Sequence, residues 1–292
     1  MQTSELLSKV RKIEIKTRHI VDEITGGAYH SVFKGRGLEF SEVREYIPGD
    51  DVRDIDWNVT ARTGQPFIKK YTEERELNVI LAVDISSSTL FGSAGYEDKH
   101  QQMIQCAALL ALSAIRNNDK VGLFLFTDRT ELLLAPRSGR IHTLRLIREL
   151  LACTGTGRKT DLRFALETLA SFQKKKSVIF LISDFMDSPD YEKSLRLLAR
   201  KHDLIAVRVR DEAEVALPLG IPALTLEGME DGRTLFFTGS SSAYARAAQE
   251  IAEKTEEICK KASVDMIELR SGEDPVKALM NFFRKRHTGK RR

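Results

Sequence analysis

The residues that most clearly could bind a ligand or take part in chemistry form the stretch Asp84-Ile85-Ser86-Ser87-Ser88. This stretch directly follows the apolar run 79–83. That run is continuously hydrophobic, which is typical of a strand buried on both faces of a parallel sheet. Polar side chains at the carboxyl end of such a strand lie where open α/β sheets bind ligands. Asp84, Ser86 and Ser88 offer hard oxygen atoms, which suit Mg²⁺ or Mn²⁺. Asp and Ser are also favoured helix caps, so capping is the alternative.

Two later loops carry side chains of the same kind. Thr160 and Asp161 end the glycine-rich loop 154–161, and Asp184 follows the apolar run 178–182. If the strands at 79–83 and 178–182 are neighbours where the strand order reverses, these loops meet over one crevice. With added water, five oxygen-bearing side chains would approach the octahedral coordination that Mg²⁺ prefers. The candidate metal ligands are Asp84, Ser86, Ser88, Thr160 and Asp184.

Strands and helices alternate through most of the chain. Apolar runs predict strands at 79–83, 121–126, 131–134, 178–182, 204–209 and 264–269. Helical spacing predicts helices over 101–115, 141–151, 162–172, 191–202, 244–262 and 275–283. The strand at 131–134 is expected at a sheet edge and to end at Pro136. The alternation predicts a doubly wound, mostly parallel, Rossmann-like α/β sheet flanked by helices.

Two segments fall outside this alternation. Residues 4–24 show helical spacing and are followed by a charged, turn-rich segment that contains the only tryptophan, Trp57. Residues 211–239 interrupt the alternation, with two short strand-like runs around Glu230-Asp231-Gly232 that indicate a hairpin. We therefore expect an N-terminal helix and extended segment over residues 1–75. The sheet domain then covers 76–292, with a hairpin-like insertion at 211–239.

The five candidate ligands resemble the metal-ion-dependent adhesion site of von Willebrand factor type A domains. Asp84-x-Ser86-x-Ser88, Thr160 in a glycine-rich loop and the strand-ending Asp184 match its pattern residue by residue. The resemblance implies a divalent metal, Mg²⁺ first and Mn²⁺ or Ca²⁺ as alternatives, with an Asp or Glu of a partner protein completing the coordination. The hydroxyls would be neutral direct ligands, which leaves the ion electrophilic toward an outside carboxylate.

The segment ahead of the sheet domain is similar to a second signature. Gly37-x-Glu39-Phe40, the run from Arg44 to Trp57 and Ala61-Arg62 resemble the prokaryotic family called "domain of unknown function fifty-eight". Its members carry this block before a type A domain, and many are encoded near MoxR-type AAA+ ATPases. The resemblance implies such an ATPase, or its client, as the partner. We interpret the charged residues of the block as an ion-pair network that holds it against the sheet: Arg44, Asp50, Arg53, Asp54, Asp56 and Arg62.

Composition bounds the remaining possibilities. A hydrophobic content of 42% and a charged content of 30% describe a globular protein with a real core, and the net charge of +4 is small. Cys106, Cys153 and Cys259 are an odd, widely spaced set, which favours a reducing compartment. The N-terminus lacks a signal-peptide pattern and the apolar runs are too short to span a bilayer, so we expect a cytoplasmic protein.

Catalysis would require more than the candidate metal ligands. A metal-dependent hydrolase normally adds a base or a second metal, and no histidine is expected beside these strand ends. Arg158 interrupts a phosphate-loop pattern, and Asp161 is explained as a helix cap. The sequence therefore favours a non-catalytic interaction module. A Mg²⁺-dependent hydrolase and a nucleic-acid-associated factor using the basic tail 284–292 are the alternatives.

Overall fold

The computed structural model describes residues 39–72, 76–91, 99–215, 224–230, 232–237 and 241–289. Its internal contacts divide the chain into two compact units, Phe33–Leu77 and the remainder. The helix expected over residues 4–24 lies outside the described residues. Within the described part of the chain, no helix has the length and apolar character to cross a membrane.

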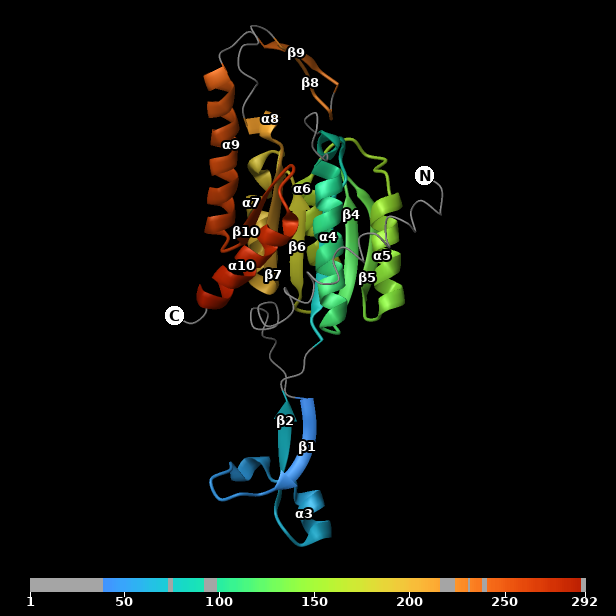
Figure 1. The fold of residues 1–292 in the computed structure, drawn as a ribbon, viewed down its shortest axis with the longest axis vertical. Helices are drawn as coiled ribbons and strands as arrows, with labels where there is room; N and C mark the ends of the chain where they lie inside the picture. Colours follow the sequence, from blue (N-terminus) through green and yellow to red (C-terminus); the bar gives the residue numbers. More distant parts are fainter. Residues whose placement is uncertain are drawn as a thin grey trace. The chain divides into compact units, whose positions relative to one another are not determined.

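The larger unit is built on a six-stranded sheet with the order β10-β7-β6-β3-β4-β5 (Figure 1). Neighbouring strands are parallel throughout, except that β5 runs antiparallel to β4 at the edge. The mostly parallel α/β fold is thereby confirmed. The strands are β3 (Asn78–Asp84), β4 (Lys120–Phe126), β5 (Thr130–Arg137), β6 (Val178–Ser183), β7 (Asp203–Arg210) and β10 (Asp265–Arg270).

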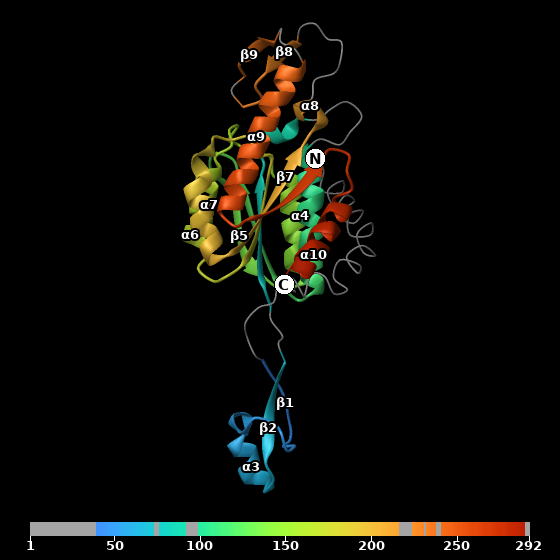
Figure 2. The ribbon, with the colours of Figure 1, turned by 90° about the vertical axis from the view of Figure 1, so that its left-hand side faces the viewer.

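Helices cover both faces of this sheet, which explains why its central strands are apolar at nearly every position. One face carries α4 (Lys99–Arg116) and α10 (Pro275–Gly289), and α5 (Arg140–Ala152) packs beside α4. Figure 2 shows α6 (Leu162–Phe172) and α7 (Glu192–Lys201) on the opposite face. There α9 (Ser241–Lys261) packs against α7. The helices α6, α7 and α9 close a core over the sheet with side chains such as Ile80, Phe124, Leu166 and Leu181.

The edge strand β5 continues further than the sequence predicted. We expected Pro136 to end it, but β5 runs through Pro136 to Arg137. The pairing with β4 is irregular between Val121 and Leu123, so an edge strand can accommodate a proline there. At the same irregularity, a Cβ on Gly122 would lie 2.9 Å from the Leu134 carbonyl oxygen. Glycine is thus required for the close approach of the two strands.

The insertion after β7 contains a short helix and a two-stranded sheet. The helix is α8 (Glu212–Val215), and β8 (Leu224–Glu227) pairs antiparallel with β9 (Thr234–Phe237). The Gly228 N–H donates to the Arg233 carbonyl oxygen at 2.8 Å, which closes the turn between these strands. Gly232 adopts φ of +65°, a left-handed conformation that favours glycine.

The smaller unit contains elements that periodicity did not predict. Strands β1 (Glu39–Glu45) and β2 (Phe67–Thr72) pair antiparallel, with the 3₁₀ turn η1 (Val52–Asp54) and helix α3 (Trp57–Thr63) between them. Asp56 caps α3 by accepting from the Asn58 N–H at 3.0 Å. Arg44 donates to both carboxylate oxygens of Asp50, at 2.7 and 2.9 Å. These charged residues therefore stabilise the unit from within.

Truncation of the core beneath α6 tests this packing. Leu166 is fully buried, so Leu166→Ala removes apolar contacts and leaves a cavity. We expect the free energy of unfolding to fall by about 2–5 kcal/mol in urea denaturation. The matched control is Ile141→Ala on α5, where the side chain is 88% exposed and the change should stay within about 0.5 kcal/mol. Equal effects of the two substitutions would contradict this account of the core.

Candidate metal centre

The strand order brings two carboxylates to the same edge of the sheet. β3 lies directly beside β6, with Val83 opposite Ile182, as the sequence analysis required. Asp84 ends β3 and Asp184 follows β6, and both side chains are buried. This is the carboxyl edge of the parallel strands at the point where the strand order reverses, the usual ligand-binding position in open α/β sheets.

Three hydroxyls from two loops meet at this edge, and we call Ser86, Ser88 and Thr160 the hydroxyl trio. Ser86 Oγ lies 3.0 Å from Ser88 Oγ and 2.8 Å from Thr160 Oγ1. The two loops are tied together because the Ser87 N–H donates to the Arg158 carbonyl oxygen at 3.0 Å. The three predicted hydroxyl ligands are thus in contact with one another, and the Ser86 hydroxyl also bonds to the Asp84 carboxylate.

Glycines allow the loop before α6 to approach so closely. A Cβ on Gly155 would lie 2.6 Å from the Ile85 carbonyl oxygen, and one on Gly157 would lie 2.2 Å from an Asp128 carboxylate oxygen. Glu131 on β5 accepts from the Gly157 N–H at 2.8 Å and from the Thr156 N–H at 3.0 Å. Burial alone would raise the pKa of Glu131, but these bonds outweigh it and lower the pKa. Glu131 is therefore an anionic anchor for the loop that carries Thr160.

Asp84 lies beneath the hydroxyl trio with both carboxylate oxygens bonded. One oxygen accepts from the Ser86 N–H at 2.9 Å, and the other accepts from the Ser183 hydroxyl at 2.7 Å. Burial, followed by the negative charge of Asp184, raises the pKa of Asp84 from 3.8 to about 7. The charge of Asp184 therefore disfavours ionisation of Asp84, and a nearby cation would relieve this repulsion.

Asp184 already has one protein cation beside it. Lys99 at the start of α4 is fully buried, and its Nζ lies 2.8 Å from Asp184 Oδ2 and 2.5 Å from Glu214 Oε1 on α8. Burial would lower the pKa of Lys99, but the attraction of the two carboxylates outweighs it and raises the pKa. We call Lys99, Asp184 and Glu214 the buried ion cluster. It links α4, the end of β6 and α8.

A carboxylate from the insertion also reaches the hydroxyl trio. Glu230, in the turn between β8 and β9, accepts from the Thr160 N–H at 3.1 Å and from Thr160 Oγ1 at 2.8 Å. The Ser88 hydroxyl also bonds to Glu230. Burial raises the pKa of Glu230 despite these bonds, and the negative charge of Asp184 raises it further. The trio is thus covered by an acidic side chain of the chain itself.

The donor set fits a hard divalent cation. The side chains that form these contacts offer oxygens of hydroxyls and of a carboxylate, the ligand type that Mg²⁺ prefers. Lys99 has a single positive charge and pairs with two acids, the buried Asp184 and the partly buried Glu214, while Asp84 lies buried at the same edge. Among the described residues, no group of three or more His, Cys, Asp or Glu side chains is arranged to hold a metal. A metal here would depend on the hydroxyls.

Sequence reasoning missed several residues at this edge. Lys99 stands in a charged run before a helix and looks like a solvated residue, and Glu230 looks like an ordinary turn residue. No sequence pattern marked either residue, because each contacts this edge from a distant part of the chain. One histidine lies near the first loop of the trio, since His100 Nδ1 is 3.4 Å from Thr89 Oγ1. Asp161 is a cap, as expected, and accepts from the Phe164 N–H.

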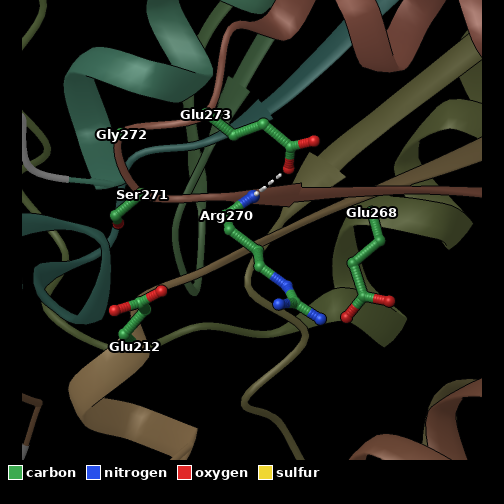
Figure 3. Close-up of a pocket in the computed structure, with 6 residues that line it drawn as sticks. All are labelled: Glu212, Glu268, Arg270, Ser271, Gly272 and Glu273. Carbon is green, nitrogen blue, oxygen red and sulfur yellow. Dashed lines mark hydrogen bonds between the residues drawn. The ribbon is translucent and has the colours of Figure 1, made fainter.

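A separate hollow lies at the carboxyl end of β10 (Figure 3). In this hollow the Glu273 carboxylate accepts from the Arg270 N–H at 3.3 Å, so one of its acids is used to hold the turn. None of the lining residues belongs to the trio or to the buried ion cluster. They are Glu212, Glu268, Arg270, Ser271, Gly272 and Glu273.

The raised pKa of Asp84 gives the metal-free protein a distinct pH dependence. Between pH 3.8 and about 7 the folded protein keeps a proton on Asp84 that the unfolded chain has released. The unfolding free energy should therefore fall as pH rises through this window, and this contribution is lost above about pH 7. In urea denaturation with EDTA, wild type should lose about 1–3 kcal/mol more than Asp84→Asn between pH 5 and pH 8. Parallel pH profiles would contradict this assignment.

The buried ion cluster can be tested by a double-mutant cycle. Lys99→Met leaves Asp184 and Glu214 buried without their cation, and we expect the unfolding free energy to fall by about 3–5 kcal/mol. Adding Glu214→Gln to Lys99→Met removes one of the unpaired charges and should recover part of this loss. Chemical denaturation of the four proteins measures the coupling. Strict additivity of the two substitutions would show that Lys99 and Glu214 do not interact.

Comparison with known proteins identifies several that are similar to this chain. Uncharacterized protein Rv1480 of Mycobacterium tuberculosis is 28% identical over 290 residues, which cover 98% of this chain and 91% of the relative. Uncharacterized protein YeaD of Bacillus subtilis is 26% identical over 110 residues, 38% of this chain and 25% of YeaD. The crystal structure of conserved hypothetical protein BatB from Bacteroides thetaiotaomicron superposes with a TM-score of 0.47 at 17% identity, over 73% of this chain and 99% of BatB.

A family model spans both units of the chain. The model described as "Protein of unknown function DUF58" matches residues 42–257, from strand β1 to the last part of α9. This range contains all five predicted ligands as well as Lys99, Glu214 and Glu230. The match extends over well more than half of the sequence, and the chain belongs to the DUF58 family.

Proposed function

We propose that this chain is a non-catalytic, metal-dependent protein interaction module. The observation that carries the proposal is the hydroxyl trio: Ser86, Ser88 and Thr160 come from two loops and lie within 2.8–3.0 Å of their neighbours. Such a concentration of neutral oxygens above buried acids is the arrangement expected for a hard cation that stays electrophilic.

Each residue has a separate part in the proposed site. The hydroxyl trio would hold the metal directly, and Asp84 and Asp184 would act directly or through water. When bound, a divalent metal, Mg²⁺ in the first place, supplies a position that attracts a partner's Asp or Glu carboxylate. Asp84 holds the Ser86 backbone through the bond from its N–H. Ser183 fixes the orientation of Asp84 by donating to its second oxygen.

The partner we propose is a MoxR-type AAA+ ATPase, or a client that such an ATPase remodels. This part rests on the family to which the chain belongs and on the sequence resemblance described above. The sheet domain, residues 76–292, would provide the metal-dependent contact, and residues 1–75 would form a separate N-terminal segment. Cys106 and Cys259 are buried free thiols, which supports the proposed cytoplasmic location.

The alternatives have less support at this site. A hydrolase needs a base, but Asp161 caps α6 and Asp187 accepts from the Leu162 N–H at 2.8 Å, so both acids hold the start of one helix. The basic tail begins inside α10, where Arg286 pairs with Asp203 and Asp265. A guanidinium used in this way is not presented to nucleic acid. Both observations favour the interaction module.

Metal binding and partner capture test the proposal together. Isothermal titration calorimetry with Mg²⁺ should give saturable binding to wild type, and we expect Ser88→Ala to weaken it by about tenfold or more. The matched control is Ser171→Ala on α6, an exposed serine away from the trio that should leave the affinity unchanged. Pull-down of the MoxR-type ATPase from the same genome should require Mg²⁺ and fail in EDTA. Capture that is equal in Mg²⁺ and EDTA would contradict the proposal.

A further inference from the structure

We propose that Glu230 is an internal ligand of the metal site, so that the β8–β9 hairpin takes the place of a partner's carboxylate. This inference rests on the proposed function of the hydroxyl trio and adds a residue that the adhesion-site pattern does not contain. It assigns to the insertion the role of a competitor that is built into the chain.

The position of the Glu230 carboxylate supports this role. Glu230 Oε1 lies 2.8 Å from Thr160 Oγ1, the same atom that lies 2.8 Å from Ser86 Oγ. The Ser88 hydroxyl bonds to Glu230 as well. The carboxylate therefore contacts two of the three hydroxyls of the trio, those of Thr160 and Ser88. A partner's carboxylate that bound a metal held by the trio would need the same oxygen-lined position.

The turn that carries Glu230 is fixed by its own hydrogen bonds. β8 and β9 pair up to Glu227 and Thr234, and the Gly228 N–H then donates to the Arg233 carbonyl oxygen. The Gly232 N–H donates to the Gly228 carbonyl oxygen at 2.8 Å. In Figure 1 this hairpin lies beyond the carboxyl ends of the sheet strands, the end where the trio is found. A short, hydrogen-bonded turn restricts where the Glu230 side chain can point.

Charge gives an independent argument. Glu230 is half-buried, and its carboxylate reaches an edge that already contains the buried acids Asp84 and Asp184. Lys99 is engaged by Asp184 and Glu214. Holding a further carboxylate at this point is unfavourable unless a cation lies among the oxygens. A divalent ion bound by the trio provides that compensation.

A ligand within the same chain competes strongly with an outside one. A tethered group acts at an effective concentration of about the millimolar range, so a partner's carboxylate must exceed this to displace it. With Glu230 in place the metal is held more tightly and is closed to outside carboxylates. When the hairpin moves away, one coordination position opens.

Water-proton relaxation of bound Mn²⁺ tests this directly, because it reports the exchangeable waters on the ion. The proteins compared are the full chain as wild type, Glu230→Ala, and the control Glu212→Ala. Glu212 is an exposed acid on α8 in the same insertion, so the control removes the same charge nearby. We expect Glu230→Ala to bind Mn²⁺ about tenfold more weakly and to show higher relaxivity from an added water, with Glu212→Ala like wild type.

Acetate then serves as a probe for an outside carboxylate. Added acetate should lower the relaxivity of the Mn²⁺ complex of Glu230→Ala, by displacing water, and leave wild type and Glu212→Ala unchanged. Mn²⁺ affinity, relaxivity and acetate response that are the same in wild type and Glu230→Ala would overturn the inference and leave the metal site standing. Absence of Mn²⁺ binding to wild type would overturn the proposed function and this inference with it.

Discussion

The placement of two acids at the ends of neighbouring parallel strands is the constraint on which the rest of the site depends. Asp84 and Asp184 are both buried, and the charge of one raises the pKa of the other. Two kinds of contact offset the unfavourable energy of burying these two acids side by side. Ser183 and the Ser86 backbone donate to Asp84, whereas Lys99 supplies a full positive charge to Asp184. Asp84 is therefore surrounded by neutral hydrogen-bond donors, whereas Asp184 forms an ion pair.

This difference bears on which residues would hold the proposed metal. Because Lys99 and the Met186 N–H engage both oxygens of Asp184, that residue has less capacity for a second cation than the sequence pattern suggests. Asp84 is instead bonded by two neutral groups, the Ser86 N–H and the Ser183 hydroxyl, and it is the acid whose pKa is raised. The hydroxyl trio is thus the part of the site best suited to direct ligation, and its neutrality preserves the attraction for an outside carboxylate.

The sequence predicted the sheet well because buried parallel strands leave a strong local pattern. Each central strand is a short apolar run, and polar residues appear where each run ends, so Asp84 and Asp184 could be located without coordinates. Lys99, Glu214 and Glu230 left no such pattern, since their roles arise from contacts between distant segments. The end of β5 was misjudged for a related reason. Pro136 is tolerated by an irregular edge pairing that only the register reveals.

The insertion after β7 contacts this edge of the sheet through two separate residues. Through Glu214 on α8 it completes the buried ion cluster around Lys99, and through Glu230 it contacts Thr160. The first contact joins a charged group to the fully buried Lys99, so it is costly to break. The second is half-buried and involves one side chain at the end of a short hairpin, so it can open at lower cost. An insertion held by the ion cluster at one end and by a single carboxylate at the other could expose the proposed metal site without disturbing Asp84 and Asp184.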